Sequence, residues 1–156
     1  MKKGILIVAG HGGSPYDPGA TGNGKKEAEL TRQFASELYN QYKKYGVDVA
    51  LYNKDFDMYK ETQKGHGAYS NQGYSNVVEV HFNAASADAH GTEVLLVSGG
   101  KPDSIDNGFL DGLNNHFTNR GFKYRSDLLN MNVYANSACS YRLIEVCFIS
   151  NKADME

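Results

Sequence analysis

Short apolar runs recur along the chain and predict β-strands. The first run covers residues 4–9 and reads Gly-Ile-Leu-Ile-Val-Ala, a continuous pattern that is typical of a strand buried on both faces. Four later runs predict strands over residues 47–52, 77–82, 92–97 and 142–149.

Apolar residues at spacings of three and four predict amphipathic helices between these strands. One helix is expected from Lys25 to Tyr45, with Gly46 ending it, and a second over residues 103–120. The polar segment 55–74 has weaker helical periodicity and predicts a third helix. Because strands and helices alternate, we expect one α/β domain over residues 1–156, with a largely parallel or mixed central sheet flanked by helices.

Composition narrows the class of protein. The chain has 156 residues, the size of one domain, and its net charge of −2 provides no basic surface for nucleic acid. No apolar run approaches the roughly 18 residues of a membrane span. Two cysteines form neither a disulfide scaffold nor a zinc–thiolate site. Seven of the 17 glycines lie between Gly4 and Gly24, which indicates a sharply turning loop after the first strand.

Three side chains are predicted to bind one metal ion. His11 follows the first strand and His81 ends the third, so the two imidazoles can converge if these strands are neighbours. Glu27 falls within the apolar stripe of the first helix, whereas Glu29 points to the opposite side. An inward carboxylate is costly unless a cation meets it, and two imidazoles with one carboxylate suit zinc.

Glu145 lies inside the apolar last strand, where a charged side chain needs a partner or a function. Near a zinc ion it suits the role of general base and later acid, with a pKa raised by burial. Glu79 is two residues from His81 on the same strand face, so we expect it either to bind that imidazole or to face solvent.

Each residue also has a structural interpretation when it is considered alone. His11 could be a turn residue, and His81 a strand-end histidine with its hydrogen bonds satisfied. Glu145 could form a salt bridge with Arg142 or Arg125. Cys147 could in principle be a nucleophile, but a cysteine in a core strand is usually inert. The four residues together favour a two-histidine, two-glutamate site.

Several motifs of the chain resemble the zinc-dependent N-acetylmuramoyl-L-alanine amidases of phage endolysins, sporulation and bacterial cell separation. They occur in the order of that family and span nearly the whole chain: Gly10-His11-Gly12-Gly13, Asp17-Pro18-Gly19-Ala20, Gly22-Asn23-Gly24-Lys25-Lys26-Glu27, Glu79-Val80-His81-Phe82-Asn83-Ala84, Gly91-Thr92-Glu93-Val94, Asn119-Arg120-Gly121-Phe122-Lys123 and residues 143–151.

The resemblance implies that His11, Glu27 and His81 match the zinc ligands of the family and that Glu145 matches its catalytic glutamate. It also implies hydrolysis of the amide between N-acetylmuramic acid and L-alanine in bacterial peptidoglycan. Two alternatives remain open at this stage: a zinc peptidase that acts on another wall amide, and a wall-binding module without turnover.

Three departures from the family pattern are expected to affect fine substrate preference. Ser140-Tyr141 stands where a Pro-Ala pair is common, Cys147 where glycine is common, and Glu79 where serine is common.

The ends of the chain lead to further expectations. Many members of the family continue beyond the position of Glu156 into another helix, so we expect a catalytic domain that lacks this helix and a separate wall-binding module. The chain shows no export signal, so we expect synthesis in the cytoplasm of a bacterial host and action on the wall after release, as for a phage lysin. We expect a monomeric domain without membrane insertion.

Overall fold

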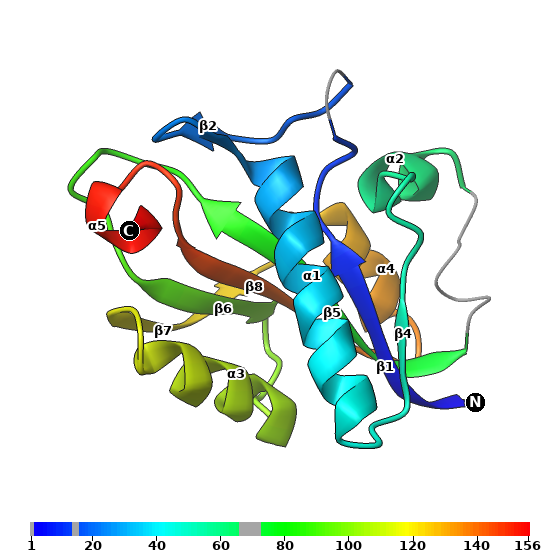
Figure 1. The fold of residues 1–156 in the computed structure, drawn as a ribbon. Helices are drawn as coiled ribbons and strands as arrows, with labels where there is room; N and C mark the ends of the chain where they lie inside the picture. Colours follow the sequence, from blue (N-terminus) through cyan, green and yellow to red (C-terminus); the bar gives the residue numbers. More distant parts are fainter. Residues whose placement is uncertain (1, 14–15, 66–72) are drawn as a thin grey trace.

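A six-stranded sheet in the order β4-β1-β5-β8-β6-β7 runs through the computed structural model, which describes residues 2–13, 16–65 and 73–156 (Figure 1). The strands β4, β1, β5 and β8 are mutually parallel, β6 is antiparallel to β8, and β7 is parallel to β6. The prediction of a mixed central sheet is therefore confirmed. The strand bounds are β1 (Lys2–Ala9), β4 (Val49–Leu51), β5 (Tyr74–Asn83), β6 (Thr92–Val97), β7 (Asn119–Arg125) and β8 (Ser140–Phe148).

Helices cover both faces of this sheet. The residues of α1 (Glu27–Lys44) and α3 (Ser104–Asn114) pack into one apolar core, and those of α2 (Met58–Gln63) and α4 (Leu129–Ala135) pack into a second core on the opposite face. A small hairpin of β2 (Thr21–Gly22) and β3 (Lys25–Lys26) precedes α1, and α5 (Lys152–Met155) follows β8. Within the described residues, no helix is both long and apolar enough to cross a bilayer.

Alternation along β5 and β8 places three acidic or imidazole side chains on one face of the sheet. In β5, Val78 and Val80 belong to the core under α1, so Glu79 and His81 face the side of α2 and α4. In β8, Ile144 and Val146 belong to that same core, so Glu145 shares the face of Glu79 and His81.

Two predicted helices differ from the structure. The helix expected over 103–120 ends at Asn114, and residues 119–125 form the edge strand β7, whose side chains are mostly polar and exposed. The helix expected over 55–74 is limited to α2. Residues 66–72 of that prediction lie outside the described residues, and β5 already begins at Tyr74. The first helix begins at Glu27 because Lys25 and Lys26 form β3.

A fully buried arginine joins β8 to the start of α3. Arg142 Nε donates to Asp106 Oδ1 at 2.6 Å, and Arg142 Nη2 donates to Asp103 Oδ2 at 2.7 Å. These two aspartates also form the capping box of α3. The guanidinium group therefore stabilises both a helix N-terminus and its position on the sheet.

The variant Arg142→Met should lower the free energy of unfolding by about 3–5 kcal/mol, because it leaves the buried Asp106 carboxylate without its partner. Denaturant unfolding of both proteins measures this loss. Arg125→Met is the matched control, since Arg125 also lies 2.7 Å from an aspartate, Asp127, but at the surface. An equal loss in the two variants would contradict the role of Arg142.

Candidate metal centre and catalytic site

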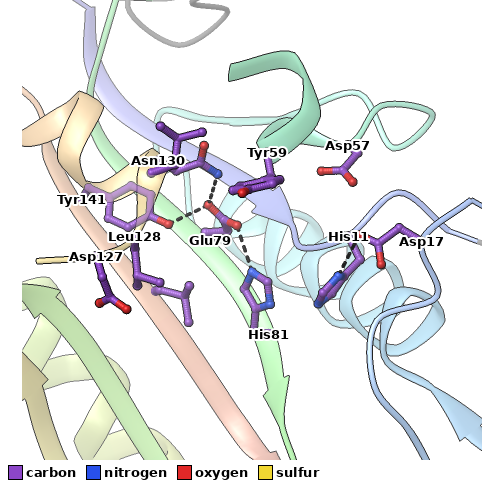
Figure 2. Close-up of a pocket in the computed structure, with 12 residues that line it drawn as sticks. His11, Asp17, Asp57, Tyr59, Glu79, His81, Asp127, Leu128, Asn130 and Tyr141 are labelled. Carbon is purple, nitrogen blue, oxygen red and sulfur yellow. Dashed lines mark hydrogen bonds and ion pairs between the residues drawn. The ribbon is translucent and has the colours of Figure 1, made fainter. Parts of the chain in front are cut away.

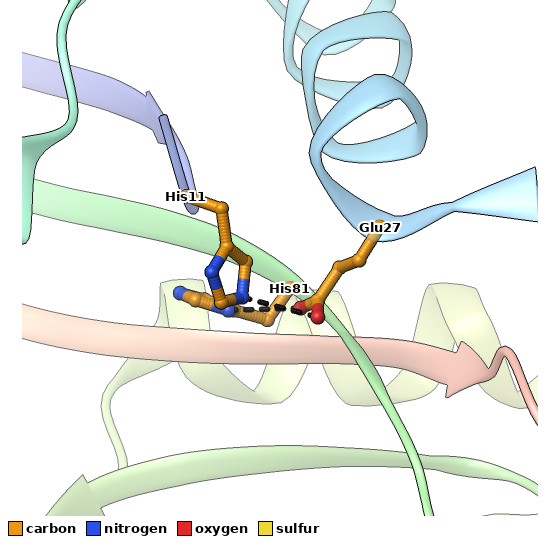
Figure 3. Close-up of side chains that lie close together, drawn as sticks. All are labelled: His11, Glu27 and His81. Carbon is orange, nitrogen blue, oxygen red and sulfur yellow. Dashed lines mark hydrogen bonds and ion pairs between the residues drawn. The ribbon is translucent and has the colours of Figure 1, made fainter. Parts of the chain in front are cut away.

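Three ligand-type side chains meet at the carboxyl ends of β1 and β5 (Figure 3). His11 follows β1, Glu27 is the first residue of α1, and His81 lies near the end of β5. One ligand atom from each residue lies within 4.8 Å of the others. Glu27 Oε2 is 3.0 Å from His11 Nε2, and Glu27 Oε1 is 3.0 Å from His81 Nδ1. The structure thus brings together the three residues that the sequence predicts as metal ligands.

Two glycines make room for these side chains. A Cβ atom at Gly10 would lie 2.4 Å from Cε1 of His81, inside the space of the ring. A Cβ atom at Gly19 would lie 2.7 Å from Glu27 Oε2, and the φ angle of this residue is +66°. Both positions therefore require glycine, which explains part of the glycine enrichment near the N-terminus.

The backbone at His11 is held in a left-handed conformation, with φ of 65°. Asp17 Oδ2 lies 3.0 Å from His11 Nδ1, which directs Nε2 toward Glu27. Two side chains of α1 hold the main chain of this loop. The Arg32 guanidinium donates to the carbonyl of His11 at 2.9 Å, and the Thr31 hydroxyl donates to the carbonyl of Gly10 at 2.8 Å. Helix α1 thus fixes the loop that carries His11.

His81 is held through its second ring nitrogen. Glu79 Oε1 lies 2.9 Å from His81 Nε2 (Figure 2). The other oxygen of Glu79 accepts from the Tyr141 hydroxyl at 2.6 Å and from Asn130 Nδ2 at 3.0 Å. Glu79 therefore binds the imidazole rather than facing solvent. This network leaves His81 Nδ1 for Glu27 or for a metal ion.

The ionisable side chains at the centre favour a positive charge between them. Burial raises the pKa of Glu27, but the two histidines outweigh burial and hold this pKa well below its usual range. Burial lowers the pKa of His81, but Glu27 and Glu79 outweigh it and raise that pKa well above the usual value. The structure thus stabilises positive charge between two ionised carboxylates. A bound metal ion would supply that charge.

The donor set fits a zinc ion. Two imidazole nitrogens and one carboxylate are ligand types that catalytic zinc sites use, and such sites keep a further position for water or substrate. The main-chain N–H groups of Ala20 and Phe82 donate to the Glu27 carboxylate at 2.9 Å and 3.0 Å, which fixes its orientation.

Glu145 lies beside this centre on the neighbouring strand. It is paired with His81 in the register of β5 and β8. Its Oε2 atom is buried and accepts no hydrogen bond from the described residues. Burial raises the pKa of Glu145 to about 7 although His81 lowers it, and the nearby carboxylates of Glu27 and Glu93 add to the rise.

The alternatives for Glu145 and Cys147 do not agree with the structure. Arg142 pairs with Asp103 and Asp106, and Arg125 pairs with Asp127, so the salt bridges considered for Glu145 are formed elsewhere. Cys147 is buried, and burial raises the pKa of its thiol to about 12, which keeps it protonated.

Two hollows meet at the histidines. The larger has a volume of about 400 Å³ and includes Glu79, Asn130 and Tyr141 in its wall. The other has a volume of about 280 Å³ and includes Glu27 and Glu145. Both hollows are lined by His11 and His81, so each lies beside the cluster of His11, Glu27 and His81.

Several supporting residues were not predicted as functional. Asp17 belongs to the motif Asp17-Pro18-Gly19-Ala20, which by itself does not predict a contact with His11. The sequence gives no sign that Thr31, Arg32 or Asn130 supports the site, because their partners are distant in the chain. Tyr141 differs from the family pattern, but its contact with Glu79 is not evident from the sequence.

The chain is similar to known proteins over nearly its whole length. Residues 5–156 match the family described as N-acetylmuramoyl-L-alanine amidase. Over 169 residues the chain is 38% identical to "Probable autolysin PH" of Staphylococcus aureus (strain NCTC 8325 / PS 47), covering 99% of this chain and 34% of that protein. Over 84 residues it is 39% identical to the "Sporulation-specific N-acetylmuramoyl-L-alanine amidase" of Bacillus subtilis (strain 168), covering 51% of this chain and 31% of that protein. The chain therefore spans about a third of the length of these relatives.

A solved structure with the same fold is the "Catalytic domain of CD27L endolysin targeting Clostridia Difficile". It superposes with a TM-score of 0.78 at 30% sequence identity, covering 98% of this chain and 85% of that one.

Proposed function

The chain belongs to the N-acetylmuramoyl-L-alanine amidase family, and we propose that it is a zinc hydrolase. The proposed substrate is bacterial peptidoglycan, and the proposed bond is the amide between N-acetylmuramic acid and the L-alanine of the stem peptide. The observation that carries the proposal is the convergence of His11, Glu27 and His81 beside the buried Glu145. The reaction would degrade the bacterial cell wall and lead to lysis.

In this proposal His11, Glu27 and His81 hold the metal. When bound there, zinc supplies Lewis-acid polarisation of the scissile carbonyl and makes water more acidic. Asp17 and Glu79 orient the two imidazoles.

Glu145 performs the proton transfers. Its pKa of about 7, set by burial, allows it to accept a proton from the attacking water and then to deliver it to the leaving amine of L-alanine. The Oε2 atom without a hydrogen-bond partner among the described residues is an acceptor ready for that water.

Product analysis tests the proposed bond. Purified peptidoglycan is digested with the zinc-loaded protein, and the fragments are identified by mass spectrometry. We expect new L-alanine N-termini and glycan chains that have lost their stem peptides. Cleavage inside the stem peptide would instead support a zinc peptidase, and binding without any cleavage would support a wall-binding module.

Glu79→Gln should weaken zinc affinity about tenfold, because it replaces the carboxylate beside His81 Nε2 with a neutral amide. Competition with a chromogenic chelator measures this affinity. Glu93→Gln is the matched control, since Glu93 is also buried but binds Asn83 and Arg120 instead of a metal ligand. Equal affinities in wild type and Glu79→Gln would show that Glu79 does not support the site.

A further inference from the structure

The larger hollow beside the metal centre has an acidic wall (Figure 2). Its lining includes the carboxylates of Asp17, Asp57, Glu79 and Asp127. Apart from the two histidines, the described residues that line it include no positively charged side chain. Asp127 is paired with Arg125, and Asp17 and Glu79 each lie beside a histidine. Asp57 is therefore the lining carboxylate that a positively charged ligand group would meet.

Two buried acceptors in this wall have unused hydrogen-bonding capacity. Asp57 is 8% exposed and Asn130 is 4% exposed. Neither Asp57 Oδ2 nor Asn130 Oδ1 accepts a hydrogen bond from the described part of the chain. Lys60 Nζ forms an ion pair with Asp57 Oδ2 at 4.0 Å, a separation too long for a hydrogen bond. A buried acceptor without a donor is unfavourable, so these atoms indicate a ligand that brings donors.

A primary ammonium group can supply the donor that either one of these acceptors lacks. It carries one positive charge and three N–H donors and accepts no hydrogen bond. Leu128 and Leu129 add an apolar part to the same wall, against which the methylene groups of an aminoalkyl side chain can pack.

We propose that this hollow is a subsite for the side-chain ammonium group of a stem-peptide residue. The inference rests on the proposed function, because the hollow shares His11 and His81 with the metal centre and so lies next to the scissile amide. The enzyme would consequently prefer stem peptides whose side-chain amine is free over those whose amine is acylated, as it is in a cross-link.

A pair of small substrates tests the subsite. One is N-acetylmuramoyl-L-alanyl-D-glutamyl-L-lysine, and the other carries an acetyl group on the lysine Nε. We expect wild-type kcat/KM to be at least about tenfold lower for the acetylated substrate, because acetylation removes charge-assisted hydrogen bonds. Asp57→Asn should reduce this ratio several-fold, and asparagine still caps α2 as Asp57 does.

Asp111→Asn serves as the matched control. Asp111 is exposed on α3, which packs on the opposite face of the sheet, so the variant should keep the full wild-type ratio. Equal cleavage of both substrates by the wild type would overturn the subsite and leave the proposed function intact. Retention of the full ratio by Asp57→Asn would also overturn it. Cleavage of neither substrate at the lactyl amide would instead count against the proposed function.

Discussion

Glu145→Gln should lower kcat/KM for amide hydrolysis by at least about a hundredfold while the zinc content stays at the wild-type level. Glutamine has nearly the size of glutamate but cannot accept and return the proton. Because Glu145 lies on β8 and is not part of the three-ligand cluster, its loss should leave metal binding intact. Kinetics on a soluble muropeptide, combined with elemental analysis, measure both quantities.

The pH profile gives a second readout of the same variant. A general base must be ionised, so wild-type activity should rise with pH through the pKa of Glu145. Burial raises this pKa to about 7, and a cation bound nearby lowers it, so the rising limb should lie at or below about pH 7. The limb should be absent from the residual activity of Glu145→Gln. Wild-type turnover in this variant would show that another group carries the proton.

Glu27→Gln should reduce bound zinc from about one ion per chain to nearly none. Both oxygens of this buried carboxylate face histidine nitrogens at 3.0 Å, and the neutral amide removes the negative charge of the centre. Added zinc should also no longer raise the melting temperature, because a metal that binds only the folded state stabilises it by mass action.

Glu29→Gln is the control for this experiment. Glu29 lies on the same helix two residues away, and its side chain is 66% exposed. The variant should keep wild-type zinc content and the zinc-dependent rise in melting temperature. If both glutamine variants bind zinc equally, Glu27 is not a ligand.

The contrast between these two glutamates was predictable from sequence. The apolar stripe of the first helix fixes its inward face, and helical geometry alone places Glu27 there and Glu29 opposite. His11 and His81 could be paired because parallel neighbouring strands end at the same edge of a sheet. The positions of all three proposed ligands therefore follow from local periodicity plus one rule of topology.

The elements that sequence did not predict lack such periodicity. The edge strand β7 pairs with β6 along one side only, and its exposed side chains give no apolar pattern. Helix α4 has seven residues, too few for a clear helical repeat. Glu79 accepts hydrogen bonds from Asn130 on α4 and from Tyr141 on β8. Both contacts join segments that are distant in sequence, so local patterns do not predict them.

The centre has two pairs of residues that differ in how much sequence change around them they tolerate. His81 and Glu145 are neighbours on adjacent strands, so the backbone ladder sets their separation. His11 and Glu27 instead follow a glycine-rich loop and begin a helix. During divergence, insertions in that loop can reshape the approach to the centre without altering the spacing of His81 and Glu145. We therefore expect substrate preference to change among such chains while the separation of His81 and Glu145 is inherited unchanged.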